Sequence, residues 1–195
     1  MIKICEYIID WLLSEEKDNQ KKRSLYLYVV YRYVSTISFS LVIGFISLFV
    51  LKSITPIIFS VFLIALRKYS GGYHLNNADV CFINSIFIAI IAYYISQWLA
   101  DSYGDSGLIF FVISVAMLSV IVSLSPVNHP NLHLTKKEAK AMKIRIAKIS
   151  AIISAVMAVS AAVKSEMLFP IFVAIMTDFI LIAAAKLTHQ ETKYI

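Results

Sequence analysis

A histidine and a cysteine stand seven residues apart in segment 67–81, behind a pair of glycines. Cys81 is one of two cysteines in the chain, and His74 is one of four histidines. A thiol that is activated by an imidazole attacks carbonyl carbon atoms, and the imidazole passes the proton to the leaving group. The pair therefore predicts nucleophilic catalysis, with Cys81 as the nucleophile and His74 as the group that moves the proton.

The backbone must turn between these two residues. In one continuous α-helix, seven residues rise by about 10.5 Å, whereas a base acts on its nucleophile at about 2.6–3.2 Å. Gly71 and Gly72 allow backbone dihedral angles that are closed to other residues, and the asparagine pair 76–77 favours turns. We therefore expect a turn around His74 and the start of a new helix close to Cys81.

That helix is expected to begin near residue 80, with Asn77 or Asp79 as its cap. Cys81 then lies in the first turn, where free amides and the helix dipole favour a thiolate and can hold an oxyanion. Asp79 has two opposing effects, because it disfavours the thiolate of Cys81 but orients the ring of His74. A third member of the constellation stays open, with Asp79, Asn77 and Ser70 as candidates by proximity alone.

The composition indicates an integral membrane protein. Hydrophobic residues make up 59% of the 195 residues and charged residues only 15%, whereas soluble domains are roughly half apolar and about a quarter charged. The N-terminus carries charges throughout and lacks the pattern of a signal peptide. We expect a single membrane domain over 1–195, comprising an interfacial region 1–32, a transmembrane bundle 33–187 and a cytoplasmic tail 188–195.

Six apolar stretches predict an all-α fold with about six transmembrane helices. A span needs about 20 residues, so the second stretch is short and is expected to cross as the tilted partner of a hairpin. The stretches are Val34–Leu51, Ile54–Leu66, Val80–Ala100, Gly107–Leu124, Ile149–Val163 and Leu168–Ala185. The fifth can gain its missing length from Met142–Lys148, whose long side chains can snorkel. Ahead of them, apolar side chains at helical spacing predict an amphipathic interfacial helix at Ile2–Leu13, with packing against the bundle as the alternative. Glu15–Arg23 is interpreted as a polar linker.

The positions of the basic residues predict the orientation. If both termini are cytoplasmic, all of the 18 Lys and Arg residues except Lys52 and Lys164 lie on the inner side. Topology then explains the net charge of +6 better than nucleic-acid binding does. The same orientation puts His74 and Cys81 on the cytoplasmic side, where thiols stay reduced.

Two charged features each have two interpretations. Arg67 binds a carboxylate of a substrate, or it anchors the end of the second span at the membrane surface. The cluster Lys136–Lys148, and above all Lys136, Lys137 and Lys140, attracts an acidic partner, or it serves only as a topology signal.

Asp178 lies near the middle of the sixth stretch, where a carboxylate is costly. We expect it to stabilise the packing of the bundle or a protomer interface through a hydrogen bond, with Asn84, Ser85 or Gln97 as partner; a proton-linked role is the alternative. The four histidines and two cysteines have no spacing that suits a metal ion, so no metal is expected.

Segment 67–81 resembles the signature of the accessory gene regulator B family of membrane endopeptidases. Arg67, Gly72, His74 and Cys81 match the family pattern in type and spacing, and the basic segment that follows the proline at 126 is similar as well. The resemblance implies a protein of the bacterial plasma membrane, a homodimer, and a propeptide partner of the AgrD type with an amphipathic leader and an acidic C-terminal tail.

The resemblance also implies a reaction that needs no cofactor. Cys81 would cleave the tail from the propeptide through a thioester, His74 would move the proton, and the product would cyclise to a thiolactone or lactone for quorum sensing. Arg67 would bind a tail carboxylate and Gly72 would meet a backbone requirement. Two other classes of function stay open, a small peptide transporter and a non-catalytic scaffold, and both should tolerate Cys81→Ser.

Overall fold

The computed structural model describes residues 20–72, 78–127 and 135–188. These residues form helices and their connections, with no strand among them. In chain order the elements are α2 (Gln20–Phe45) with a π-helical extension η1 (Ile46–Val50), α3 (Thr55–Ser70), α4 (Ala78–Tyr103), a short 3₁₀ turn η2 (Gly104–Ser106), α5 (Gly107–Leu124), α6 (Lys136–Ala162) and α7 (Leu168–Leu187).

Each of the six predicted apolar stretches lies in a separate helix. The predicted bounds of α5 agree with the structure at both ends, because Gly107 and the Ser125-Pro126 pair limit the apolar run. Two bounds were wrong. The residues Gln20–Arg23 belong to α2 rather than to a linker, and α6 begins well before Ile149. The expected helix at Ile2–Leu13 lies outside the described residues.

The early start of α6 has a local cause. Thr135 accepts a hydrogen bond from the backbone N–H of Glu138, while the Glu138 carboxylate accepts one from the Thr135 N–H at 2.9 Å. This reciprocal capping box satisfies amide groups that the first turn leaves without helical partners. The sequence signal, a threonine followed three residues later by a glutamate, could have identified this helix start.

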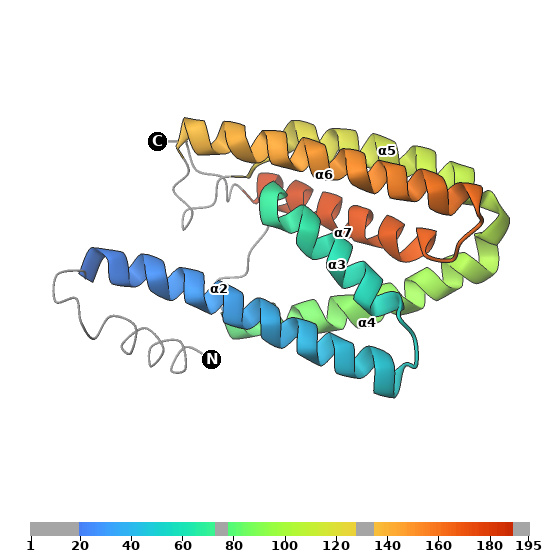
Figure 1. Ribbon diagram of the computed structural model, residues 1–195, viewed down its shortest axis with the longest axis horizontal. Coiled ribbons are helices and arrows are strands. Elements are labelled where there is room, and N and C mark those ends of the chain that lie inside the picture. The colour runs from blue at the N-terminus through green and yellow to red at the C-terminus, as the bar shows by residue number, and fades with distance from the viewer. Residues whose placement is uncertain (1–19, 73–77, 128–134, 189–195) are drawn as a thin grey trace.

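The helices run alternately in opposite directions (Figure 1). The connections from α2 to α3, from α4 to α5 and from α6 to α7 lie at one end of the bundle. At the opposite end α3, α5 and α7 stop and α4 and α6 begin. This up-and-down arrangement brings the C-terminal end of α3 and the N-terminal end of α4 to the same end of the molecule.

Four helical segments of the described chain are long and apolar enough to cross a membrane: Val29–Val50, Asp79–Leu124, Lys136–Ala162 and Leu168–Leu187. The second has 46 residues and contains both α4 and α5, which turn back on each other at η2 (Figure 1). The 16 residues of α3 are shorter than the roughly 20 that a full span needs. The expected count of six crossings therefore stays a prediction.

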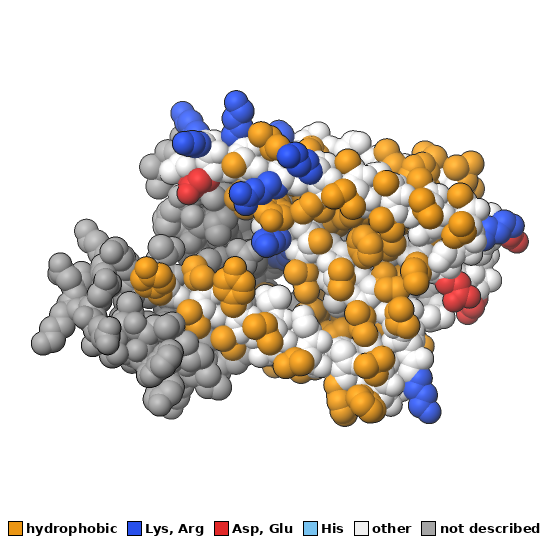
Figure 2. Space-filling view, in the orientation of Figure 1, with side chains coloured by type: hydrophobic (Ala, Val, Ile, Leu, Met, Phe, Trp, Pro, Cys, Tyr) orange, Lys and Arg blue, Asp and Glu red, His pale blue; other side chains and the backbone are white. Residues whose placement is uncertain are grey.

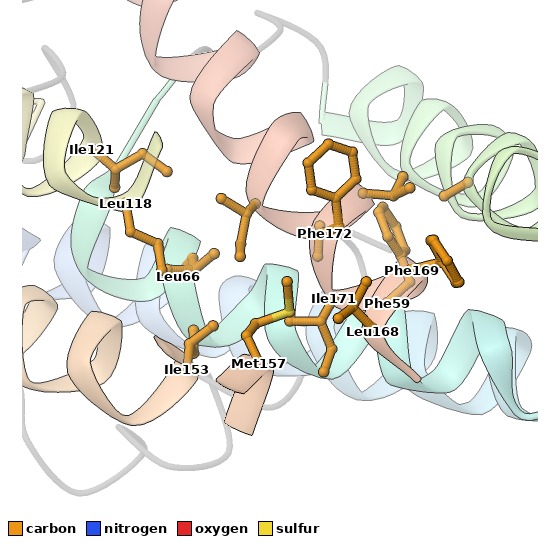
Figure 3. Packing of buried hydrophobic residues seen from close by; sticks show 14 of the residues in the cluster. Phe59, Leu66, Leu118, Ile121, Ile153, Met157, Leu168, Phe169, Ile171 and Phe172 are labelled. Carbon is orange, nitrogen blue, oxygen red and sulfur yellow. The ribbon is translucent and has the colours of Figure 1, made fainter. Parts of the chain in front are cut away.

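The core lies where α7 packs against α3, α4, α5 and α6. Figure 3 shows apolar side chains of α3, α5 and α6 packed against those of α7. They are Phe59 and Leu66 of α3, Leu118 and Ile121 of α5, Ile153 and Met157 of α6, and Leu168, Phe169, Ile171 and Phe172 of α7. The outer faces expose further large apolar side chains, including Ile37, Leu41 and Phe45 of α2. Apolar side chains both inside and outside are typical of helices in a bilayer, so the fold is that of a membrane protein.

Candidate functional site

The segment that carries the predicted site begins at the C-terminal end of α3. The helix stops because Gly71 adopts φ 77° and ψ −136°, a conformation that L side chains rarely reach, and its N–H donates to the Arg67 carbonyl at 3.4 Å. Gly72 follows with φ 119°. Both glycines therefore lie in the turn that was predicted from the sequence, directly after α3.

Ser70, the last residue of α3, is joined to Asp178 in the middle of α7. The Ser70 hydroxyl donates to the Asp178 carboxylate at 3.0 Å, and it also lies 3.3 Å from the Gly71 carbonyl. The side chains of Ser70 and Asp178 are both fully buried. A hydrogen bond to a carboxylate in such a site is stronger than one between neutral groups.

Asp178 thus has the buried hydrogen bond that the sequence predicted, but with a different partner. Ser85 instead donates to the Cys81 carbonyl at 2.9 Å, Gln97 lies 3.4 Å from the Thr55 hydroxyl, and Asn84 is exposed. Ser70 and Asp178 are 108 positions apart in the sequence. Whether two such residues meet depends on how their helices pack, which the pattern of apolar residues along the chain does not reveal.

Arg67 lies one turn before Ser70 on α3 and is half-buried. The second carboxylate oxygen of Asp178, Oδ2, is buried and accepts no hydrogen bond within the described part of the chain. Ser70 and Asp178 therefore form a buried polar pair next to the glycine turn, with Arg67 one turn earlier on α3.

The segment after α5 holds the same turn from another side. The Val127 N–H donates to the Ser70 carbonyl at 2.9 Å. A Cβ atom on Gly71 would lie 2.8 Å from the Val127 carbonyl oxygen, so the two backbones approach as closely as glycine permits. Ser125, Pro126 and Val127 are all buried. Three segments distant in sequence, from α3, the end of α5 and α7, are thus fixed together at this point.

Cys81 is the fourth residue of α4 and lies in its first turn, as the sequence predicted. It is a free thiol and half-buried. Asp79, in the same turn, is exposed. The first amides of a helix lack helical acceptors and carry the positive end of the dipole, which suits an attacking thiolate and an oxyanion. His74 and Asn77 lie outside the described residues, so the pairing of His74 with Cys81 stays a prediction.

A basic surface covers the same end of the bundle. Blue side chains gather where α6 begins (Figure 2). The basic surface consists of the exposed residues Lys68, Lys136, Lys137, Lys140, Lys143, Arg145 and Lys148. Tyr69 links its two helices, because the Lys68 ammonium lies 5.5 Å and the Arg145 guanidinium 5.9 Å from the centre of its ring. Lys68 of α3 and Arg145 of α6 therefore both lie close to one ring.

The described residues include no group of three or more His, Cys, Asp or Glu side chains that could hold a metal ion. Among protein families, the model described as Accessory gene regulator B matches residues 4–183. This match covers most of the chain and includes every site residue named above. Comparisons with curated proteins and with solved structures found no match.

Proposed function

The chain belongs to the accessory gene regulator B family, and we propose that it is a membrane cysteine endopeptidase that cleaves and cyclises a propeptide. Membership of the family implies a role in processing the propeptides of quorum sensing. Beyond family membership, our proposal covers the chemical reaction, the residues that carry it out and the side of the membrane on which it occurs.

In the first step the Cys81 thiolate attacks the carbonyl carbon of the peptide bond between the signal segment and the C-terminal tail. His74 takes the thiol proton and donates it to the amine of the tail when the carbon–nitrogen bond breaks. The tail leaves with a free amino group, and the signal segment stays bound to Cys81 as a thioester. Amides of the first turn of α4 stabilise the oxyanion of the tetrahedral intermediate.

In the second step a thiol or hydroxyl within the signal segment attacks the thioester. The sulfur–carbon bond to Cys81 breaks, the proton of the attacking group returns to the Cys81 thiolate through His74, and a thiolactone or lactone ring forms. Exchange of one thioester for another is nearly isoenergetic, so cysteine suits a cyclising enzyme. A site that keeps water from the acyl-enzyme favours ring closure over hydrolysis.

The observation that carries this proposal is the position of Cys81. The half-buried thiol lies in the first turn of α4, at the end of the bundle where the Gly71–Gly72 turn also lies (Figure 1). The free amides of this turn can stabilise an oxyanion next to the thiol. The alternatives of a transporter and a scaffold receive no comparable support from the described residues.

The basic surface supports both an orientation and a way of binding substrate. Basic residues favour the cytoplasmic side, so this end of the bundle faces the cytoplasm, where the propeptide is made. The acidic tail of the propeptide is attracted to the exposed Lys136, Lys137 and Lys140. Arg67, half-buried in the last turn of α3, binds a carboxylate of the tail or anchors the end of α3 at the membrane surface.

Cleavage of a propeptide in membranes tests the proposal. Wild type is compared with Cys81→Ala and His74→Ala at matched expression, using a peptide with an amphipathic leader, an internal cysteine and an acidic tail. We expect both variants to lose cleavage, whereas Cys5→Ser, which removes the other thiol of the chain, retains it. Undiminished cleavage by Cys81→Ala would overturn the proposal.

A further inference from the structure

The buried polar pair next to the glycine turn contains a carboxylate for which the reaction described above has no use. Asp178 is fully buried in α7, in a segment apolar enough to cross a membrane. Burial of a carboxylate in such a place is costly unless charge and hydrogen bonds compensate for it. A leucine or alanine would pack against α3 without this cost, so general packing of the bundle does not explain the aspartate.

The hydrogen-bond partner of Asp178 indicates what it acts on. Its Oδ1 atom accepts from the hydroxyl of Ser70 at 3.0 Å. Ser70 is the last residue of α3 and directly precedes the Gly71–Gly72 turn. The contact therefore fixes the point at which the chain leaves α3.

The main chain of Ser70 is held by a second contact. The Val127 N–H donates to the Ser70 carbonyl at 2.9 Å, and the Val127 carbonyl abuts Gly71. The Ser70 side chain is thus bound from α7 and its main chain from the end of α5. Two independent contacts on one residue restrict both the position and the direction of the turn that follows.

We propose that Asp178 is a positioning residue for the proposed reaction: through Ser70 it fixes the Gly71–Gly72 turn, from which the chain continues toward His74 in the sequence. The inference rests on the proposed function. It assigns Asp178 and Ser70 no contact with substrate, so loss of either should lower the rate of the chemical step and leave substrate binding nearly unchanged. A small displacement of a catalytic group can cost about 100-fold in rate.

Two variants separate the contacts. Ser70→Ala removes the hydroxyl and retains the carboxyl group of Asp178, whereas Asp178→Asn retains an acceptor for Ser70 and replaces the carboxyl group by an amide. Ser60→Ala is the matched control, because Ser60 is also a buried serine of α3 and its hydroxyl has no hydrogen-bond partner within the described residues. If one of the two variants fails to fold, the other carries the test.

The first readout is single-turnover cleavage at varied propeptide concentration. We expect Ser70→Ala and Asp178→Asn to reduce the maximal rate at least tenfold, with the half-saturating concentration within about twofold of wild type. Ser60→Ala should match wild type in both quantities. Wild-type maximal rates in Ser70→Ala and Asp178→Asn, or an equal loss in Ser60→Ala, would overturn the inference.

The second readout needs no substrate and would not respond to a merely structural role. In a Cys5→Ser background, the rate at which iodoacetamide alkylates Cys81 is measured. The proposed reaction has His74 accept the thiol proton, so His74→Ala should slow alkylation. Ser70→Ala and Asp178→Asn should slow it as well, and Ser60→Ala should not. A wild-type alkylation rate in the two variants would contradict the positioning role.

Failure of the inference differs from failure of the proposed function. If Cys81→Ala abolishes cleavage while Ser70→Ala and Asp178→Asn cleave at the wild-type rate, the function stands and the positioning role is wrong. If Cys81→Ala still cleaves, the function is wrong, and the positioning role that depends on it is wrong as well.

Discussion

At the end of the bundle where α3 stops, Ser70 and Asp178 are fully buried and joined by a hydrogen bond. At the opposite end, Lys164 and Asp105 form an ion pair of 2.7 Å whose side chains are 70% and 92% exposed. The hydrogen bond from Lys164 to Asp105, together with the charge attraction between them, raises the pKa of Lys164. Water and salt screen an exposed pair of this kind, so its contribution to stability is small.

The turns at the two ends differ in the same way. The connections after η1 and after α6 use Lys52 and Lys164 at positive φ, and both residues are exposed. At the other end the glycine turn is packed against Val127. Both ends of the bundle have an acidic side chain and a tight turn. Near Gly71 the acidic side chain is buried and the turn is packed against the backbone of another segment, whereas Asp105 and Lys164 are exposed.

The largest loss of stability and of cleavage is expected for Gly71→Ala. A Cβ atom would lie 2.8 Å from a backbone oxygen at a dihedral angle that side chains rarely adopt, and strain of this kind costs about 1–3 kcal/mol. We predict a fall of roughly 5 °C in the melting temperature and a loss of most propeptide cleavage. Thermal unfolding in detergent and cleavage in membranes measure the two effects.

Gly104→Ala, at the opposite end, is the matched control for that change. No atom lies within 4 Å of a Cβ built there, so melting temperature and cleavage should equal those of wild type. Equal losses of melting temperature and cleavage in Gly71→Ala and Gly104→Ala would show that the close backbone contact at Gly71 has no special effect.

An intermediate effect is expected from reversing charge on the basic surface. The combined change Lys136→Glu, Lys137→Glu and Lys140→Glu should raise the half-saturating propeptide concentration by roughly tenfold at low ionic strength, because the acidic tail loses its attraction. The difference should shrink as salt is added. Lys52→Glu, a reversal at the other end, should leave substrate binding unchanged. An equal effect of Lys52→Glu would refute a local role of the basic surface.

The smallest effect is expected for Lys164→Ala, which removes the exposed ion pair with Asp105. Neither the melting temperature nor the cleavage rate should change measurably, since both side chains are largely in solvent. A clear loss of cleavage would mean that the end opposite the proposed site contributes to catalysis.

Much of the fold could be predicted from the sequence because membrane helices are encoded by continuous apolar runs. The ends of α5 and the start of α7 at Leu168 were found from such runs alone. The placement of Cys81 in the first turn of α4 was likewise predicted, from asparagines and an aspartate ahead of an apolar run.

The remainder depended on contacts that no local pattern contains. Asp178 was identified as unusual because a carboxylate is costly in an apolar span, but its partner Ser70 could not be found, since helix rotation and packing determine which side chains meet. The close approach of Val127 to Gly71 has the same origin. In contrast, the start of α6 was missed even though Thr135 and Glu138 carried a recognisable capping signal.

The most direct test of the central claim, that Cys81 is the nucleophile, is mass spectrometry of the full-length protein trapped during reaction with a propeptide that lacks its internal cysteine or serine. Without that internal nucleophile, cyclisation cannot release the acyl group. We predict that wild type gains the mass of the leader and signal segment without the tail, that the adduct maps to Cys81 and that hydroxylamine removes it. An adduct-free enzyme that still releases the tail, or an adduct that persists in Cys81→Ala, would contradict the account.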